Sequence, residues 1–165
     1  MRLIPILLLL LMPNLLSAKA VKGTCTYEGL SFMGVSLFEG KGCEIKGSVK
    51  KSGGSISGNF SVDLTKLDTG INSRNKHMRG YLKTKKFPHA KVYLDKVSAK
   101  PGTRKFTGKL RLKGVVQKIS GKIKFKGNTA VATFKVDVSK HGVGVIKYKS
   151  ETLGPEINVK ATFTI

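Results

Sequence analysis

Acidic residues are scarce in this chain of 165 residues, which has nine Asp and Glu against 31 Lys and Arg. None of the nine belongs to a motif that brings two carboxylates together, and no Ser or Cys lies in a nucleophile elbow. The three histidines, His77, His89 and His141, share no spacing such as H-E-x-x-H, so a metal site is not expected. The sequence therefore predicts a protein that is not an enzyme.

The chain also lacks internal linkers, low-complexity segments and repeats, which favours one compact unit. Its one long apolar run, residues 3–16, follows Arg2 and precedes the small-residue cleavage pattern Ala18-Lys19-Ala20. Residues 1–20 are therefore predicted to be a cleaved signal peptide, and residues 21–165 one domain, in the periplasm or secreted. An uncleaved anchor is the alternative, but Pro13 and Asn14 interrupt the run.

Only two cysteines are present, Cys25 and Cys43, and their spacing is unlike that of a C-x-x-C motif. In an exported protein, two cysteines more often form a structural bridge than a metal pair or a redox centre. We predict a disulfide between them, which would tie the first strand to the second. The alternative is two separate buried thiols.

Alternation of apolar and polar residues is the dominant pattern, as in Phe60, Val62 and Leu64, which are separated by Ser61 and Asp63. It predicts eight strands: an irregular one within 24–38, and others over 43–50, 56–65, 90–97, 105–113, 118–126, 129–138 and 157–165. Mostly short turns join them, which requires antiparallel neighbours. The pattern alone does not decide between a two-sheet sandwich and a closed barrel.

One short helix is predicted over 73–83, after the turn residues Asp68-Thr69-Gly70. Ile71, Met78 and Leu82 recur near helical spacing there. A helix of this length is not stable alone in water, so it must dock against the rest of the domain.

The residues around this helix carry a resemblance to a known family. The run Leu67-Asp68-Thr69-Gly70, then Arg74-Asn75-Lys76-His77-Met78-Arg79, Tyr81-Leu82 and Lys86-Phe87-Pro88, and the later run 106–115, resemble the signature of the YceI-like family. The resemblance covers residues 53–165, and the family's Arg-Asp pair reads Arg74-Asn75 here. It implies an all-β fold, an eight-stranded antiparallel lipocalin-like barrel with one short helix near one end, in a secreted protein that binds polyisoprenoids or related lipids.

Small residues are frequent on the inward faces of the predicted strands, which leaves two interpretations of the interior open. The barrel is either fully packed, or it has an apolar cavity suited to a long hydrocarbon chain. The family resemblance favours the lipid. The expected ligand contacts in the wall are Ile56, Phe60, Val62, Phe106, Gly108, Leu110, Ile123, Ala132, Phe134 and Phe163. No cofactor is expected beyond a bound lipid, and the sequence indicates no oligomeric state.

Arg74 and His77 lie on the predicted helix and are candidates for contact with the polar head of a lipid. A guanidinium can pair with an anionic head group, and an imidazole can donate or accept a hydrogen bond. The alternative is that both residues hydrogen-bond to the preceding Leu67–Gly70 turn and hold the helix in place.

Basic residues greatly outnumber acidic ones in the predicted mature chain. Removing Arg2 and Lys19 with the signal peptide leaves 29 basic and nine acidic residues, a net charge of +20. Two neighbouring strands present a basic face made of Lys105, Lys109, Arg111, Lys113, Lys118, Lys122, Lys124 and Lys126. This face is either a solvated surface or a site for an anionic membrane or polyanions. The alternative function is therefore that of a basic periplasmic or surface adaptor with a filled barrel, which binds anionic lipid head groups or polyanions through this face. Nucleic acid is not expected, because no aromatic residues are interleaved with these lysines.

Overall fold

Strands make up most of the computed structural model, which describes residues 17–165. The elements in chain order are β1 (Lys19–Ser31), β2 (Ser36–Ser52), β3 (Ser55–Asp63), η1 (Leu64–Lys66), α1 (Asn72–Leu82), β4 (His89–Ser98), β5 (Gly102–Leu112), β6 (Val115–Lys126), β7 (Thr129–Asp137), η2 (Val138–His141), β8 (Ile146–Tyr148) and β9 (Glu151–Thr164). The apolar run of the expected signal peptide lies outside the described residues, so its cleavage stays a prediction.

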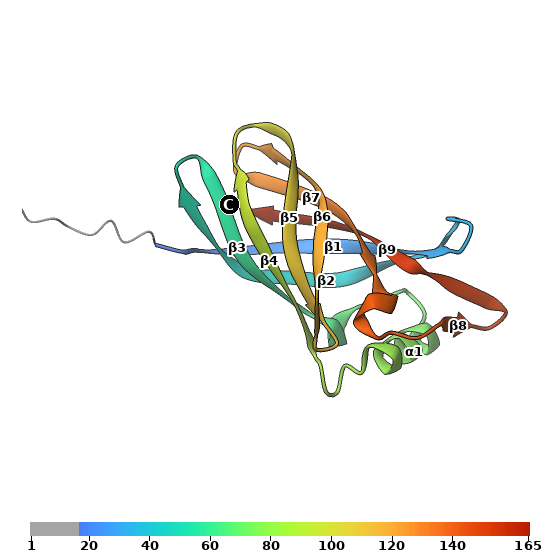
Figure 1. Cartoon of the computed structure of the whole chain (residues 1–165). Helices are drawn as coiled ribbons and strands as arrows, with labels where there is room; N and C mark the ends of the chain where they lie inside the picture. The colour runs from blue at the N-terminus through green and yellow to red at the C-terminus, as the bar shows by residue number, and fades with distance from the viewer. Residues whose placement is uncertain (1–16) are drawn as a thin grey trace, which may run out of the picture.

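Eight of these strands form a closed ring (Figure 1). Every neighbouring pair is antiparallel, in the order β1-β2-β3-β4-β5-β6-β7-β9, and β9 pairs back onto β1. Closure leaves no unpaired edge, which is the liability of an open sheet. The predicted eight-stranded barrel with one short helix is therefore confirmed. β8 is a further short strand that pairs only with β9, outside the ring.

The first hairpin differs most from the pattern in the sequence. β1 begins at Lys19 and reaches Ser31, and β2 runs from Ser36 to Ser52, so the irregular strand expected within 24–38 is the end of one strand, a turn and the start of the next. The register shifts twice along the pair, between Cys25 and Tyr27 and between Gly29 and Leu30. Both bulges put the extra residue on β2 and break the alternation before Cys43, so the pattern does not resolve the first half of this strand.

The helix α1 covers Asn72–Leu82, within one residue of the prediction. It ends because Lys83 adopts a left-handed backbone conformation, with φ 51°, and donates its N–H to the carbonyl groups of Arg79 and Gly80. In the part of the chain that the structure describes, no helix has the length and apolar content needed to cross a bilayer.

The two ends of the barrel differ, and we name them by what they carry. The turn end holds the tight β2–β3, β4–β5 and β6–β7 connections. The helix end holds the segments 32–35, 64–88, 113–116 and 138–150, with α1, η1, η2 and β8 (Figure 1). Side chains fill the interior near the turn end, where the buried residues are Val21, Val49, Ile56, Val97, Phe125 and Ala130. Any space inside the barrel therefore lies toward the helix end.

Candidate functional site: an apolar cavity at the helix end

The barrel encloses a cavity of about 240 Å³ in the half nearer α1. Its wall is almost entirely carbon, and its polar lining residues, such as Arg74, His77 and Tyr148, come from the helix end. A cavity of this size exceeds the space that one water molecule needs by about an order of magnitude. Because the wall offers almost no hydrogen-bond partners, the cavity suits an apolar guest better than water or a polar metabolite.

Most of the predicted wall contacts lie in the lining. They are Phe60, Val62, Phe106, Leu110, Ile123, Ala132, Phe134 and Phe163. Two aromatic pairs stand among them: the ring centroids of Phe60 and Phe163 are 4.8 Å apart, and those of Phe106 and Phe134 are 5.9 Å apart. Such pairs contribute roughly 0.5–1.5 kcal/mol beyond the area they bury, so they hold parts of the wall in one arrangement.

Two predicted contacts lie elsewhere. Ile56 has only 1% of its surface exposed and packs in the filled half of the barrel, away from the cavity lining. Gly108 is also absent from the lining, because its backbone lies against the neighbouring strand: a β-carbon there would come within 2.4 Å of the carbonyl oxygen of Tyr93. Alternation assigned both to the inward face, but it does not show how far along the barrel the interior is filled.

Small side chains explain why space remains. Ala90, Ala132 and Ala161 line the cavity, where larger residues would fill it. Gly121 has a different part, because a β-carbon at this position would lie 2.8 Å from the β-carbon of Phe134 and 2.9 Å from the ring of Phe106. This glycine therefore makes room for an aromatic pair of the wall and not for the ligand.

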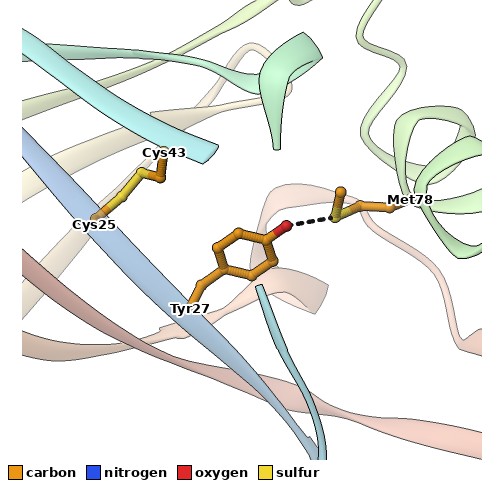
Figure 2. Close-up of a disulfide and its surroundings, with 4 residues drawn as sticks. All are labelled: Cys25, Tyr27, Cys43 and Met78. Carbon is orange, nitrogen blue, oxygen red and sulfur yellow. Dashed lines mark hydrogen bonds between the residues drawn. A yellow bond between two sulfur atoms is a disulfide. The ribbon is translucent and has the colours of Figure 1, made fainter. Parts of the chain in front are cut away.

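A disulfide joins Cys25 to Cys43, as the sequence predicted (Figure 2). The two residues face each other across β1 and β2, with their Cα atoms 5.0 Å apart, and both line the cavity. The bridge lies next to the first register shift of this hairpin. Disulfides persist in oxidising compartments, so the bridge indicates an extracytoplasmic protein.

Tyr27 connects the barrel wall to α1 (Figure 2). Its hydroxyl group donates to the sulfur of Met78 over 3.6 Å, and its ring packs edge-on against Phe38, with centroids 6.2 Å apart. Burial raises the pKa of Tyr27, the charge of Asp68 raises it further, and the charge of Arg79 opposes both. The phenol therefore stays protonated at any physiological pH and keeps its donor.

Arg74 lies at the mouth of the cavity between two aromatic rings. Its guanidinium carbon is 5.2 Å from the ring centroid of Phe38 and 5.1 Å from that of Tyr148. No carboxylate of residues 17–165 forms an ion pair with it. His77 is exposed and its ring meets the Tyr148 ring edge-on, with centroids 5.8 Å apart. The rings fix the position of the guanidinium and leave its N–H groups available to an anion.

Asn75 ties α1 to the Leu67–Gly70 turn. This corrects the alternative interpretation, in which Arg74 and His77 made hydrogen bonds to that turn and held the helix in place. The side-chain oxygen of Asn75 accepts from the N–H and the hydroxyl of Thr69, at 2.8 and 2.7 Å. Its amide group donates to Asp68 over 2.6 Å. That hydrogen bond, followed by one from the N–H of Gly70, lowers the pKa of Asp68.

β8 completes the mouth. The Tyr148 hydroxyl lies 2.9 Å from the Ser73 hydroxyl, and the N–H of Lys147 donates to the Tyr81 hydroxyl over 3.3 Å. Sequence analysis missed Phe38 and Tyr148, the two rings around Arg74. Tyr148 belongs to a strand of only three residues, too short to show alternation, and Phe38 follows the irregular first turn. An aromatic residue within reach of a helical arginine has no signature in the linear sequence.

The three histidines lie on different elements. His77 is on α1, His89 begins β4, and His141 ends η2, where only 2% of its surface is exposed and its Nδ1 lies 3.1 Å from the carbonyl oxygen of Val115. Over residues 17–165, no three His, Cys, Asp or Glu residues come close enough together to hold a metal ion.

The basic face of β5 and β6 lies on the outside of the barrel, and its exposed members are Lys105, Lys109, Arg111, Lys118, Lys122, Lys124 and Lys126. Lys105 stands directly opposite Lys122, and Lys109 opposite Lys118. Lys113 departs from the prediction. It is half-buried in the β5–β6 turn with φ 51°, and its ammonium group donates to the carbonyl oxygen of Gly142.

Comparison with known proteins is consistent with this fold. A family model described as the YceI-like domain matches residues 20–165. The structure is similar to that of BcnA from Burkholderia cenocepacia, with a TM-score of 0.71 and 19% identity over 87% of this chain and 96% of the other. It is also similar to a polyisoprenoid binding domain from Saccharophagus degradans implicated in plant cell wall breakdown (TM-score 0.67, 14% identity, 89% and 97% covered). A YceI protein of Campylobacter jejuni gives a TM-score of 0.62 at 18% identity, with 76% and 82% covered. No curated protein matches the sequence.

Proposed function

We propose that this chain, which belongs to the YceI-like domain family, binds one elongated apolar lipid inside its barrel. It would do so in the periplasm or after secretion. The lipid proposed is a polyisoprenoid or a related isoprenoid or fatty chain. The observation that carries this proposal is the apolar cavity at the helix end, whose wall combines aromatic and aliphatic side chains with alanines that leave space. The role is one of binding and not of catalysis.

The size of the cavity constrains the ligand. Sites that hold a drug-sized molecule measure roughly 300–1,000 Å³, and this cavity measures about 240 Å³. A single narrow chain fits such a space better than a bulky fused-ring molecule. A longer chain would extend from the cavity toward the helix end, where Arg74 and His77 line it.

Polar groups at the mouth support a ligand with a polar or anionic head. Arg74 is fixed by the rings of Phe38 and Tyr148 and is free of carboxylate partners among the described residues. The fold is shared with a protein described as a polyisoprenoid binding domain, which favours the isoprenoid among apolar chains. In this proposal, the tail occupies the barrel and the head lies beside Arg74.

Organic extraction and native mass spectrometry of the purified protein test the proposal. We expect the parent protein to release an apolar molecule, and the variant Ala132→Phe to release at least about ten times less. The reason is that Ala132 lines the cavity and is 7% exposed, so a phenyl group at this position projects into the space for the ligand. The added ring takes up part of this space and removes contacts that a guest would make with the wall.

The matched control is Val131→Phe, at the next residue of β7, whose side chain belongs to the opposite face of the strand and is absent from the lining. It should release as much ligand as the parent. Circular dichroism and thermal unfolding verify that both variants are folded. A parent protein that releases no apolar molecule, or an Ala132→Phe variant that is folded and releases the parental amount, contradicts the proposed function.

The second candidate function is a basic adaptor that acts through its outer surface. The observation in its favour is the pair of directly opposed lysines on β5 and β6, Lys105 with Lys122 and Lys109 with Lys118. Like charges placed opposite each other destabilise a sheet. Binding of an anionic partner to this face would offset that cost. The filled barrel that this candidate assumed holds only for the turn end, and the liposome experiment below separates this face from the helix end.

A further inference from the structure

We propose that the helix end of the barrel docks on the surface of an anionic lipid bilayer. In this arrangement, the apolar side chains of the β1–β2 turn insert among the lipid head groups, and lysines around the mouth lie against anionic heads. The inference goes beyond the binding of one lipid, and it rests on the proposed function only for its purpose, which is to present the cavity mouth to the membrane.

The exposed apolar residues are the first observation. Among residues 17–165, the large apolar side chains exposed to solvent are Phe32, Met33, Val35, Ile71, Tyr93, Val115, Val116 and Val145. All except Tyr93 belong to the helix end. Phe32 and Met33 are the most exposed, at 68% and 89%, and they occupy the tip of the β1–β2 hairpin. Single exposed apolar residues are normal, but their concentration at one end of a molecule marks an interaction site.

The turn end shows the contrast. Its connections are Ser52-Gly53-Gly54-Ser55, Lys100-Pro101 and Gly127-Asn128, which contain no large apolar side chain. These are ordinary polar turns, as expected where a protein faces water. The asymmetry between the two ends is visible in Figure 1, where α1, β8 and the β1–β2 turn gather away from the tight turns. The apolar surface at the helix end is therefore specific to the end that holds the mouth.

The charge of the helix end is the second observation. The basic residues of its described segments are Lys66, Arg74, Lys76, Arg79, Lys83, Lys85, Lys86, Lys113, Lys140, Lys147 and Lys149. The only acidic residue there is Asp68, and Glu151 and Asp137 flank the segments. Each lysine or arginine held near an anionic leaflet adds to the attraction between the protein and the membrane. An end that combines exposed apolar side chains with an excess of basic residues has the composition typical of interfacial membrane binding.

This composition favours a bilayer over a second copy of the chain. Interfaces between proteins are depleted of lysine in their centres, and two copies meeting at this end would bring the same basic residues together. Glu28 and Glu39, which stand opposite each other on β1 and β2, lie on the wall of the barrel. They lie near the tip, three residues before Ser31 and three after Ser36, and the Glu28 carboxylate accepts a hydrogen bond from Asn158.

The mouth lies beside the apolar tip. Leu37 and Phe38 follow the turn directly and line the cavity, and Leu153 of the lining pairs with Ser31, the last residue before the turn. Insertion of Phe32 and Met33 into the head-group layer would bring the mouth to the bilayer surface. A lipid would then move between membrane and cavity without crossing bulk water.

Vesicle flotation tests the proposal with the full mature chain. We expect the parent protein to bind vesicles of phosphatidylcholine containing phosphatidylglycerol, and to bind weakly to phosphatidylcholine alone. The variant Phe32→Ser/Met33→Ser should lose at least about tenfold in partitioning to the anionic vesicles, because burying one such side chain changes a partition coefficient by about that factor or more. The control Tyr93→Ser removes the exposed apolar side chain on the wall and should bind like the parent.

Charge reversals locate the basic contact. Lys76→Glu/Lys85→Glu/Lys86→Glu changes exposed lysines at the helix end, and Lys105→Glu/Lys109→Glu/Lys122→Glu makes the same change in net charge on the β5–β6 wall. Binding should fall at least about tenfold more in the first triple variant than in the second, because surface charges act within about one Debye length, roughly 8 Å at physiological salt. Equal losses, or a larger loss in the wall variant, would overturn the proposal and favour the adaptor function.

Two results with the Phe32→Ser/Met33→Ser variant would overturn the proposal. If the Phe32→Ser/Met33→Ser variant binds vesicles as the parent does, the apolar tip is not the docking surface and the proposal fails. If the parent forms dimers in sedimentation velocity and this variant does not, the tip covers a second copy, which also overturns it. Extraction of copurified lipid from the same samples keeps the two proposals separate: an empty cavity with intact vesicle binding contradicts the proposed function alone.

Discussion

The side chain of Asn75 shows how one residue orients the mouth. It is 6% exposed and satisfies three partners from one turn: the N–H and hydroxyl of Thr69 and the carboxylate of Asp68. Because α1 is short and its first residues have no side-chain cap, this network replaces the capping that a free helix would need. The position of Arg74, one residue earlier on the same helix, depends on it.

Replacement of Asn75 by alanine should lower the free energy of unfolding by about 1–3 kcal/mol at pH 7, because it leaves the buried groups of Thr69 without a partner. Asn72→Ala, at an exposed position of the same helix, is the control and should change little. Urea unfolding followed by circular dichroism measures both. An Asn75→Ala loss no larger than that of Asn72→Ala would show that packing alone holds α1.

The same variant has a pH dependence with a definite sign. Asn75 lowers the pKa of Asp68 in the folded state, so the stability that comes from this carboxylate is present above its unfolded pKa and is lost as pH falls through the lowered value. The difference in unfolding free energy between the parent and Asn75→Ala should therefore shrink as pH is lowered from about 5 to below 3. A difference that stays constant over this interval would mean that the Asp68 contact contributes nothing.

Two elements leave the barrel toward the helix end by the same local device. β3 ends at Asp63 and β7 at Asp137, and each aspartate accepts hydrogen bonds from the N–H and hydroxyl of the residue two positions later, Thr65 or Ser139. These bonds lower the pKa of both carboxyls. The surrounding sequences match, Val62-Asp63-Leu64-Thr65-Lys66 and Val136-Asp137-Val138-Ser139-Lys140. This motif converts a strand into a 3₁₀ turn and directs the chain across the mouth.

The β1–β2 hairpin is held by its disulfide where its register is irregular. The variant Cys25→Ala/Cys43→Ala opens a loop with a sequence separation of 18 residues. It should lower the free energy of unfolding by about 3 kcal/mol on the chain-entropy model. For a domain of this size, that corresponds to a fall in the melting temperature of about 6–12 °C.

Calorimetry of the oxidised parent, the reduced parent and the double variant checks this prediction. Reduced parent and variant should melt at similar temperatures, both below the oxidised parent. A variant as stable as the oxidised parent would show that the neighbouring ladder with β9 already fixes β1.

At the scale of the whole molecule, positive charge exceeds what the fold can neutralise. Residues 21–165 have a net charge of +20, since 29 basic residues face nine acidic ones. The ion pairs within the described chain are Lys66–Glu44, Lys135–Glu156 and Lys140–Asp137, all at the surface. Exposed pairs contribute little to stability, so the dominant electrostatic effect on the folded barrel is self-repulsion.

The melting temperature should therefore rise with sodium chloride at low ionic strength. Between about 10 and 150 mM salt the Debye length falls from about 30 to 8 Å, which screens repulsion between distant lysines. We expect a rise on the order of 2–4 °C, equivalent to about 1 kcal/mol. In Lys122→Glu, which faces Lys105, the melting temperature at low salt should be higher and its salt dependence smaller. A melting temperature independent of salt would contradict this electrostatic account.

Alternation along the sequence was sufficient to predict β3 to β7, the second half of β2 and most of β9, because each has one face in water and one in the core. It failed in the first half of β2, where two bulges break the period, and at β8, which is too short to have a period. The site was predicted in the same way: wall residues such as Phe60, Phe106 and Phe134 followed from their inward positions. The extent of filling did not, and Ile56 and Gly108 lie outside the cavity for that reason.

The sequence by itself determined which side chains of most strands face inward and that the chain is strongly basic, because these depend on local pattern and composition. It predicted the disulfide, which the structure confirms. Only the tertiary structure decided that the interior is filled at one end and hollow at the other. It also decided that Arg74 lies between Phe38 and Tyr148, and that most exposed apolar residues belong to the helix end. These features join residues far apart in the chain, and closure of the barrel, which β9 completes by pairing with β1, brings them together.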